Sequence, residues 1–202
     1  MRNPELVTRR VCRTCNNGWM NRLDVAAQPL LTRLLIGERF TITRLPDVAL
    51  LASWAAKIAI VTDAAQTTEP ALAPEHGRYL HDHRRPPPGW LIWLAHAEPQ
   101  TESTAALNAF TLLRPAGLGY VTTTIVNQLV LQSLVLPAPE PLGTHPFAEH
   151  ALQLWPLTYR TIAWPHAQSL DAAGIVRFAD VIAGEPLTSE SPPPHVPVRG
   201  AS

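Results

Sequence analysis

The stretch DVALLASWAAKIAIVTDA, residues 47–64, decides the fold more than any other part of the chain. Between Val48 and Val61 only Ser53 and Lys57 interrupt the apolar residues, and their spacing places them on one side of a helix. A helix with so narrow a polar stripe buries most of its surface. The sequence therefore predicts a buried central helix over about 47–64. The apolar run itself is too short to span a bilayer, so no membrane segment is expected.

A second helical pattern precedes this helix. Apolar residues from Trp19 to Leu35 keep the spacing of one helix face, and Gly37 is a suitable stop. The sequence Asn-Asn-Gly at 16–18 is typical of a turn, so the helix is expected to start near Trp19. Pro29 lies inside it and lacks a backbone donor, which predicts a kink there.

The pattern changes to strands after a proline-rich turn at 84–89. A weaker helical pattern precedes that turn over 74–82, and alternating or β-branched residues follow it. Trp90 and Trp93 are expected on opposite faces of the first strand. The expected strands are 90–97, 107–113, 119–136 (two strands or one bulged strand), and a hairpin of 152–155 with 159–164 that has Pro156 in its turn. With a closing helix over 171–182, these elements predict an α+β fold with an antiparallel sheet.

Charge is distributed unevenly in a chain whose formal net charge is zero. Only 16% of the 202 residues are charged, yet residues 1–44 carry a net charge of +5 and residues 45–202 carry −5. A basic segment suits an anionic partner such as DNA, but a solvated face of arginines explains the charge equally well. The candidate nucleic-acid contacts are Arg9, Arg10, Arg13, Arg22 and Arg33.

The N-terminal residues are charged and polar and lack the apolar segment of a secretory signal. We therefore expect a cytoplasmic protein in a reducing compartment. In such a compartment a disulfide between Cys12 and Cys15 is less expected than free thiols or a bound metal.

Cys12 and Cys15 are the only cysteines, and their CxxC spacing admits three interpretations. They are a thioredoxin-like redox pair, two ordinary cysteines, or half of a zinc knuckle. A redox pair is expected at the end of a strand in a βαβ unit, and the residues before Cys12 offer at most a short strand. The knuckle is favoured, because Asn-Asn-Gly and an amphipathic helix follow the pair, as in the C-terminal half of a treble-clef zinc module.

The stretch VCRTCNNGWMNRLDVAAQPLLTRLLIG, residues 11–37, resembles the second half of the HNH-endonuclease-like proteins. Their signature reads CxxCNxGWM followed by an acidic residue. The resemblance continues in LASWAAKIAIV at 51–61 and in GWLIWLA at 89–95, although its specific part is confined to residues 11–60.

The resemblance implies roles for four residues of this chain. Cys12 and Cys15 match the second ligand pair of a structural zinc ion. Asn16 matches the helix-side position that helps to hold a catalytic divalent metal such as Mg²⁺, and Asn17 is a weaker candidate for it. The implied activity is metal-dependent hydrolysis of DNA.

The chain lacks the part of the family motif that should precede Cys12. The first cysteine pair and the catalytic histidine should precede Cys12 by a few tens of residues, but only eleven residues precede it and none is Cys or His. We therefore expect an incomplete nuclease site. The missing half was lost, was omitted by a misassigned start, or is supplied by a partner chain, for example in a homodimer. The zinc is then weakly held or absent, and Mg²⁺ binds only to a completed site.

Two functions from different classes follow. The first is an HNH-endonuclease-like, nucleic-acid-associated protein, and the alternative is a non-catalytic binding or scaffold protein derived from such a nuclease. The expected division is a remnant HNH half over 1–40, an α+β core over 41–184 and a disordered Pro- and Ser-rich tail over 185–202. His76, His81 and His83 could form a metal cluster, but solvated surface histidines are the favoured interpretation.

Overall fold

The computed structural model describes most of the chain between residues 11 and 184. Residues 185–202, where a disordered tail is expected, lie outside the described residues, as do Arg9 and Arg10. The described ranges are 11–65, 70–99, 108–113, 119–136, 145, 147–157, 161–165 and 168–184.

Helices come first along the chain and strands follow, as the sequence pattern predicted. The helical elements are α1 (Arg13–Cys15), the π-helical turn η1 (Asn16–Met20), α2 (Asn21–Leu35), α3 (Leu45–Ala65), α4 (Pro74–His83) and α5 (Ala172–Gly184). The strands are β1 (Phe40–Ile42), β2 (Trp90–Ala97), β3 (Asn108–Leu113), β4 (Tyr120–Val126), β5 (Leu129–Val135), β6 (Ala151–Trp155), β7 (Ile162–Trp164) and β8 (Ser169–Leu170). The predicted α+β class is confirmed.

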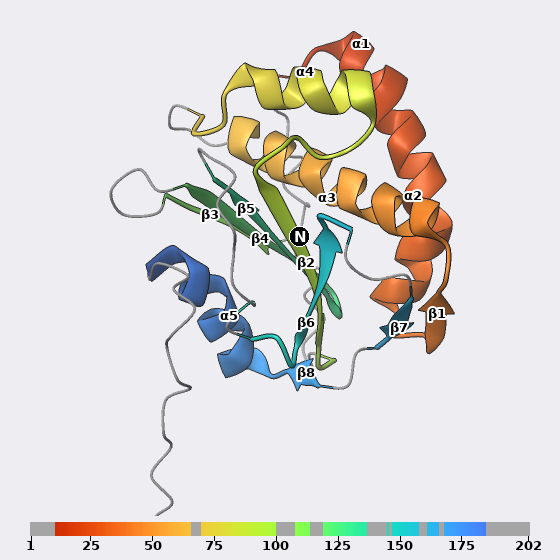
Figure 1. The fold of residues 1–202 in the computed structure, drawn as a ribbon, viewed down its shortest axis with the longest axis vertical. Coiled ribbons are helices and arrows are strands. Elements are labelled where there is room, and N and C mark those ends of the chain that lie inside the picture. Colours follow the sequence, from red (N-terminus) through yellow and green to blue (C-terminus); the bar gives the residue numbers. More distant parts are fainter. Residues whose placement is uncertain are drawn as a thin grey trace, which may run out of the picture.

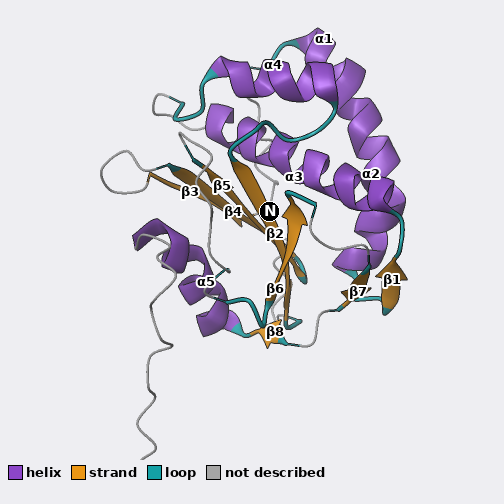
Figure 2. Ribbon diagram, in the orientation of Figure 1, coloured by secondary structure: helices purple, strands orange, loops and turns teal. Residues whose placement is uncertain are grey.

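The main sheet lies between two helical layers (Figure 1). Its strand order is β3-β4-β5-β2-β6 with antiparallel neighbours, and the short β8 adds to β2 in parallel. Helices α2, α3 and α4 lie on one side of the sheet and α5 lies on the other (Figure 2). Strands β1 and β7 form a separate two-stranded sheet beside the end of α2.

Strand β2 is buried along its whole length because helices cover both faces of the sheet. Trp90 belongs to the core that faces α2, α3 and α4, and Trp93 belongs to the core on the side of α5. The predicted placement of these two tryptophans on opposite faces is confirmed. The predicted segment 119–136 forms two strands, β4 and β5, joined by a tight turn in which Asn127 has a φ of 52°.

Helix α3 is the central helix that the apolar pattern predicted. It is longer than the apolar run, and by length and composition alone its 21 residues could cross a membrane. Its surroundings identify it as a core helix, because it packs against α2, α4 and the sheet. It also buries two charged residues, Lys57 and Asp63, of which Asp63 accepts hydrogen bonds from the backbone N–H groups of Ala71 and Leu72, both at 3.0 Å.

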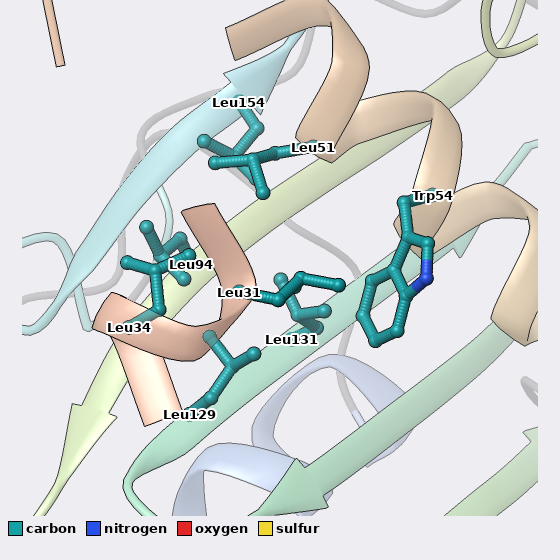
Figure 3. Close-up of a pocket in the computed structure, with 8 residues that line it drawn as sticks. All are labelled: Leu31, Leu34, Leu51, Trp54, Leu94, Leu129, Leu131 and Leu154. Carbon is teal, nitrogen blue, oxygen red and sulfur yellow. The ribbon is translucent and has the colours of Figure 1, made fainter. Parts of the chain in front are cut away.

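The junction between α2, α3 and the sheet is tightly packed. Figure 3 shows side chains from α2, α3 and the sheet converging there, and the space between them is too small to hold a water molecule. Leu34 and Leu94 are completely buried at this junction. The residues drawn are Leu31, Leu34, Leu51, Trp54, Leu94, Leu129, Leu131 and Leu154. This space is part of the hydrophobic core and offers no ligand site.

The predicted hairpin near the C-terminal part of the chain is wrong. The segments 152–155 and 159–164 do not form a hairpin, because β6 pairs with β2 and β7 pairs with β1. Periodicity identified the strand segments but carries no information about which strand each one pairs with. The pairing brings Phe40 opposite Trp164, so the segment after α2 closes against the C-terminal part of the chain. The short strands β1 and β8 have no pattern long enough to reveal them.

Candidate functional site

The CxxC motif forms the first turn of a helix. Cys12 has extended backbone angles and caps the helix that begins at Arg13. The backbone N–H of Cys15 donates a hydrogen bond to the Cys12 Sγ, with 3.0 Å between the two atoms. Both sulfur-bearing residues therefore lie within one helical turn at the start of the helix.

The predicted turn at Asn16-Asn17-Gly18 is wrong, because the helical path continues through it. Asn16–Met20 form a π-helical turn, and only Gly18 leaves helical geometry, with φ −96° and ψ −108°. The helix then continues as α2 from Asn21. The side-chain cap at Cys12 starts the helix six residues before the predicted position at Trp19.

The two thiols have different acidities. Hydrogen bonding from the Cys15 side chain and backbone lowers the pKa of Cys12, which is exposed. Hydrogen bonding to Cys12 together with burial raises the pKa of Cys15, and an interaction with the Trp19 indole acts in the opposite direction. Cys12 therefore ionises first, and a thiolate is the form that binds a metal or attacks a disulfide.

The predicted site residues lie along one helical segment. Asn16 and Asn17 are exposed in η1 directly after the cysteines, and Arg13 is exposed in the same first turn. Arg22 is exposed at the start of α2. The structure thus brings these residues near the CxxC motif by sequence proximity alone.

Arg33 lies apart from the other candidates. It is in the last turn of α2, about 16 Å along the helix from Arg22. Its guanidinium contacts the Glu38 carboxylate at 2.6 Å and stacks over the Phe40 ring at 3.8 Å. These contacts hold the turn between α2 and β1, so Arg33 already has a structural role.

The described residues contain no group of three His, Cys, Asp or Glu side chains that could hold a metal ion. His76 accepts the Trp90 indole N–H at 2.6 Å, and burial lowers its pKa. His81 hydrogen-bonds to Asp82 and meets the Trp19 ring edge-on, and His83 stacks on Tyr79. Cys12 and Cys15 alone fit two of the four positions of a tetrahedral zinc site.

Asp24, the first acidic residue after the CxxC motif, has two partners that sequence analysis missed. Asp24 accepts the Trp54 indole N–H at 2.8 Å and also binds the Lys57 ammonium group. Asp24 is in α2, whereas Trp54 and Lys57 are in α3, so these contacts join the two helices. The signal was present in the sequence, because a lysine in a buried helix requires a carboxylate partner.

A second polar cluster lies at the far end of β2. His96 is buried and contacts the Ser169 hydroxyl through Nδ1 at 2.7 Å and the Gln128 side chain through Nε2 at 3.1 Å. The ring also meets Trp164 edge-on. These contacts hold β8, the β4–β5 turn and β7 to one strand, which is a structural role.

Comparison of the chain with protein-family models, with curated proteins and with solved structures found no match. The resemblance to HNH-endonuclease-like proteins therefore rests on the sequence of residues 11–60.

Proposed function

We propose that this chain is an HNH-endonuclease-like, nucleic-acid-associated protein that contributes half of a zinc site. The observation that carries the proposal is the placement of Cys12 and Cys15 in the first turn of one helix, with the Cys15 N–H donating to the Cys12 sulfur. Backbone donors to sulfur and the helix N-terminus favour the thiolate, which is the ligand form of cysteine. Two thiolates leave two positions of the zinc tetrahedron for another segment or a partner chain.

A bound zinc ion would supply folding energy to the segment around the motif, since structural zinc ions hold their ligands' segments together. Cys12 and Cys15 would hold it, and the Cys15 N–H would orient the Cys12 sulfur. Asn16, exposed beside the pair, is the proposed ligand for a catalytic divalent metal if the nuclease site is completed.

Cobalt binding tests the half-site, because Co²⁺ occupies zinc sites and absorbs light when thiolates coordinate it. We expect a thiolate-to-cobalt band that a chelator removes rapidly, since two thiolates make an incomplete site. Cys12→Ser and Cys15→Ser should each abolish the band, and Thr14→Ser in the same turn is the matched control. A band that survives both cysteine variants, or no band at saturating Co²⁺, would contradict the proposal.

Binding of duplex DNA should be weak, independent of sequence and sensitive to salt. Arg13 and Arg22 are exposed near the motif and carry the proposed phosphate contacts. Arg13→Gln and Arg22→Gln should each weaken binding and reduce the salt slope by about 1 in fluorescence anisotropy. Arg78→Gln, which removes an exposed arginine that pairs with Glu75, is the control and should change neither. Equal effects of all three variants would argue against this contact surface.

We expect no DNA cleavage by residues 1–202 in Mg²⁺ or Mn²⁺. Hydrolysis requires a general base next to the metal-bound water, and none of the residues 1–15 that precede Asn16 is a histidine. A plasmid-nicking assay of the purified chain checks this expectation. Metal-dependent nicking that disappears in Asn16→Ala would show that the nuclease site is complete.

The opposite pKa shifts of the two thiols favour a second candidate function, thiol–disulfide exchange. A lowered pKa at the capping Cys12 and a raised pKa at Cys15 match an attacking and a resolving cysteine. On this account iodoacetamide should modify Cys12 several-fold faster than Cys15 at pH 7, and the chain should reduce insulin disulfides. If iodoacetamide modifies Cys12 first but the chain does not reduce insulin, the exchange function is ruled out and only the metal-binding proposal remains.

Both functions suit a reducing compartment, so we place the protein in the cytoplasm.

A further inference from the structure

A surface cleft of about 420 Å³ opens between α2, α3 and the end of α4. Its lining includes the apolar residues Leu23 and Leu50 and the basic residues Arg22 and Arg84. The volume lies within the range of small-molecule sites, and the mixture of apolar walls with a few polar groups is typical of them. No pattern in the sequence indicated this cleft, because its residues come from η1, α2, α3 and the C-cap of α4.

The two arginines of the cleft lack an acidic partner. Neither Arg22 nor Arg84 forms an ion pair with any described residue, whereas Arg33, Arg44 and Arg78 each do. An anion bound in the cleft would give these unpaired guanidinium groups an oppositely charged partner. Arginine also presents paired donors that match a carboxylate or a phosphate group.

Arg84 is held in place before any ligand arrives. It adopts a left-handed conformation, with φ 54°, and caps α4 through its N–H to the Leu80 carbonyl. The Ser53 hydroxyl of α3 lies 2.9 Å from the Arg84 carbonyl and 2.7 Å from the Ala49 carbonyl, and its one hydrogen is shared between the two. The guanidinium lies over the Trp19 ring, 5.3 Å from its centroid. Such preorganisation reduces the entropy lost on binding.

We propose that this cleft binds a small organic anion, with its acidic group between Arg22 and Arg84 and its apolar body against Leu23 and Leu50. The expected ligand carries either a carboxylate or a phosphate monoester on a compact apolar body. The cleft is not lined by either cysteine but shares Arg22 with the proposed DNA contacts. Arg84→Gln and Ala49→Phe separate the two proposals, because neither residue is a proposed DNA contact, whereas Arg13→Gln should weaken DNA binding alone.

Calorimetric titration of the full chain with three naphthalene probes tests this site. The probes are 1-naphthyl phosphate, 1-naphthoate and the neutral 1-naphthalenemethanol. We expect the better anion to bind with a dissociation constant on the order of 0.1 mM, and the neutral probe at least tenfold more weakly. The ranking of the two anions identifies the acidic group. Equal binding of the neutral probe, or binding by none of the three, would overturn the proposal.

Single substitutions in the cleft test whether the anion binds there. Arg22→Gln and Arg84→Gln should each lower the affinity for the anion about tenfold, which corresponds to one charged hydrogen-bonding partner. Arg78→Gln is the matched control and should leave the affinity unchanged. Ala49→Phe should block the cleft without removing either arginine, so the site stays testable even if Arg84→Gln unfolds. Full affinity in Arg22→Gln and in Ala49→Phe would show that the anion binds elsewhere.

Discussion

Replacing Asp24 with Ala should lower the free energy of unfolding by about 2–4 kcal/mol. The Lys57 ammonium group would lose its carboxylate while 6% of the residue remains exposed, and the Trp54 indole N–H would lose its acceptor. The estimate is below that of a fully buried pair, because 46% of the Asp24 side chain is exposed and water can partly replace the carboxylate. Urea unfolding followed by tryptophan fluorescence measures the change.

A double-mutant cycle separates this interaction from simple loss of packing. Lys57→Met removes the charge and keeps a chain of similar length, so the Asp24→Ala change should cost at least about 1 kcal/mol less in that background. Glu75→Ala is the control for an exposed pair and should cost less than about 1 kcal/mol. Additive effects of Asp24→Ala and Lys57→Met would show that the two side chains do not stabilise each other.

Lowering the pH from 7 to 4.5 should destabilise the fold through His145. This residue is 5% exposed, and burial lowers its pKa from the ordinary 6.5 to about 3. Its Nδ1 accepts the Phe147 backbone N–H, and its Nε2 lies 2.9 Å from the Gln132 side-chain oxygen, so the neutral ring satisfies both neighbours. Gln132 in turn donates to the Phe178 carbonyl, which connects β5 to α5.

The sign of the effect follows from proton uptake. The folded chain keeps His145 neutral, whereas the unfolded chain protonates it below about 6.5. Its contribution is therefore fully present above pH 6.5 and is lost as the pH falls from 6.5 toward 3. The slope approaches about 1.4 kcal/mol per pH unit within that window.

Urea unfolding at pH 7 and at pH 4.5 checks this contribution. His145→Gln should be less stable at pH 7 but should lose less stability on acidification than the unaltered chain. His83→Gln replaces an exposed histidine and serves as the control, with the same pH dependence as the unaltered chain. If His145→Gln keeps the full pH dependence, other groups cause the acid sensitivity.

Much of the fold could be predicted because the spacing of apolar residues along the chain indicates which faces of a helix or strand are buried. The nearly uninterrupted apolar run of α3 predicted a central helix, and the spacing of Trp90 and Trp93 predicted their placement on opposite faces of one strand. The partner of each strand could not be predicted. The pairing of β1 with β7 joins segments more than one hundred residues apart, and no local pattern records such a contact.

The candidate site was predictable only where it is local in sequence. The CxxC spacing identified Cys12 and Cys15, but it did not reveal that the Cys12 side chain caps a helix and starts it at Arg13. The bond between Asp24 and Lys57 spans two helices, and the arginine cleft combines residues of η1, α2, α3 and the C-cap of α4. These features depend on how helices pack, which amphipathic spacing alone does not determine.

Native mass spectrometry of the purified chain with added Zn²⁺ tests the proposed half-site most directly. We predict a zinc ion that is stripped by mild chelation or that bridges two copies of the chain, and no retained zinc when Cys12 and Cys15 are both replaced by Ser. A single zinc ion held tightly by one chain would contradict the half-site and would require two further ligands. Retention of zinc by the double serine variant would contradict the assignment of the cysteines themselves.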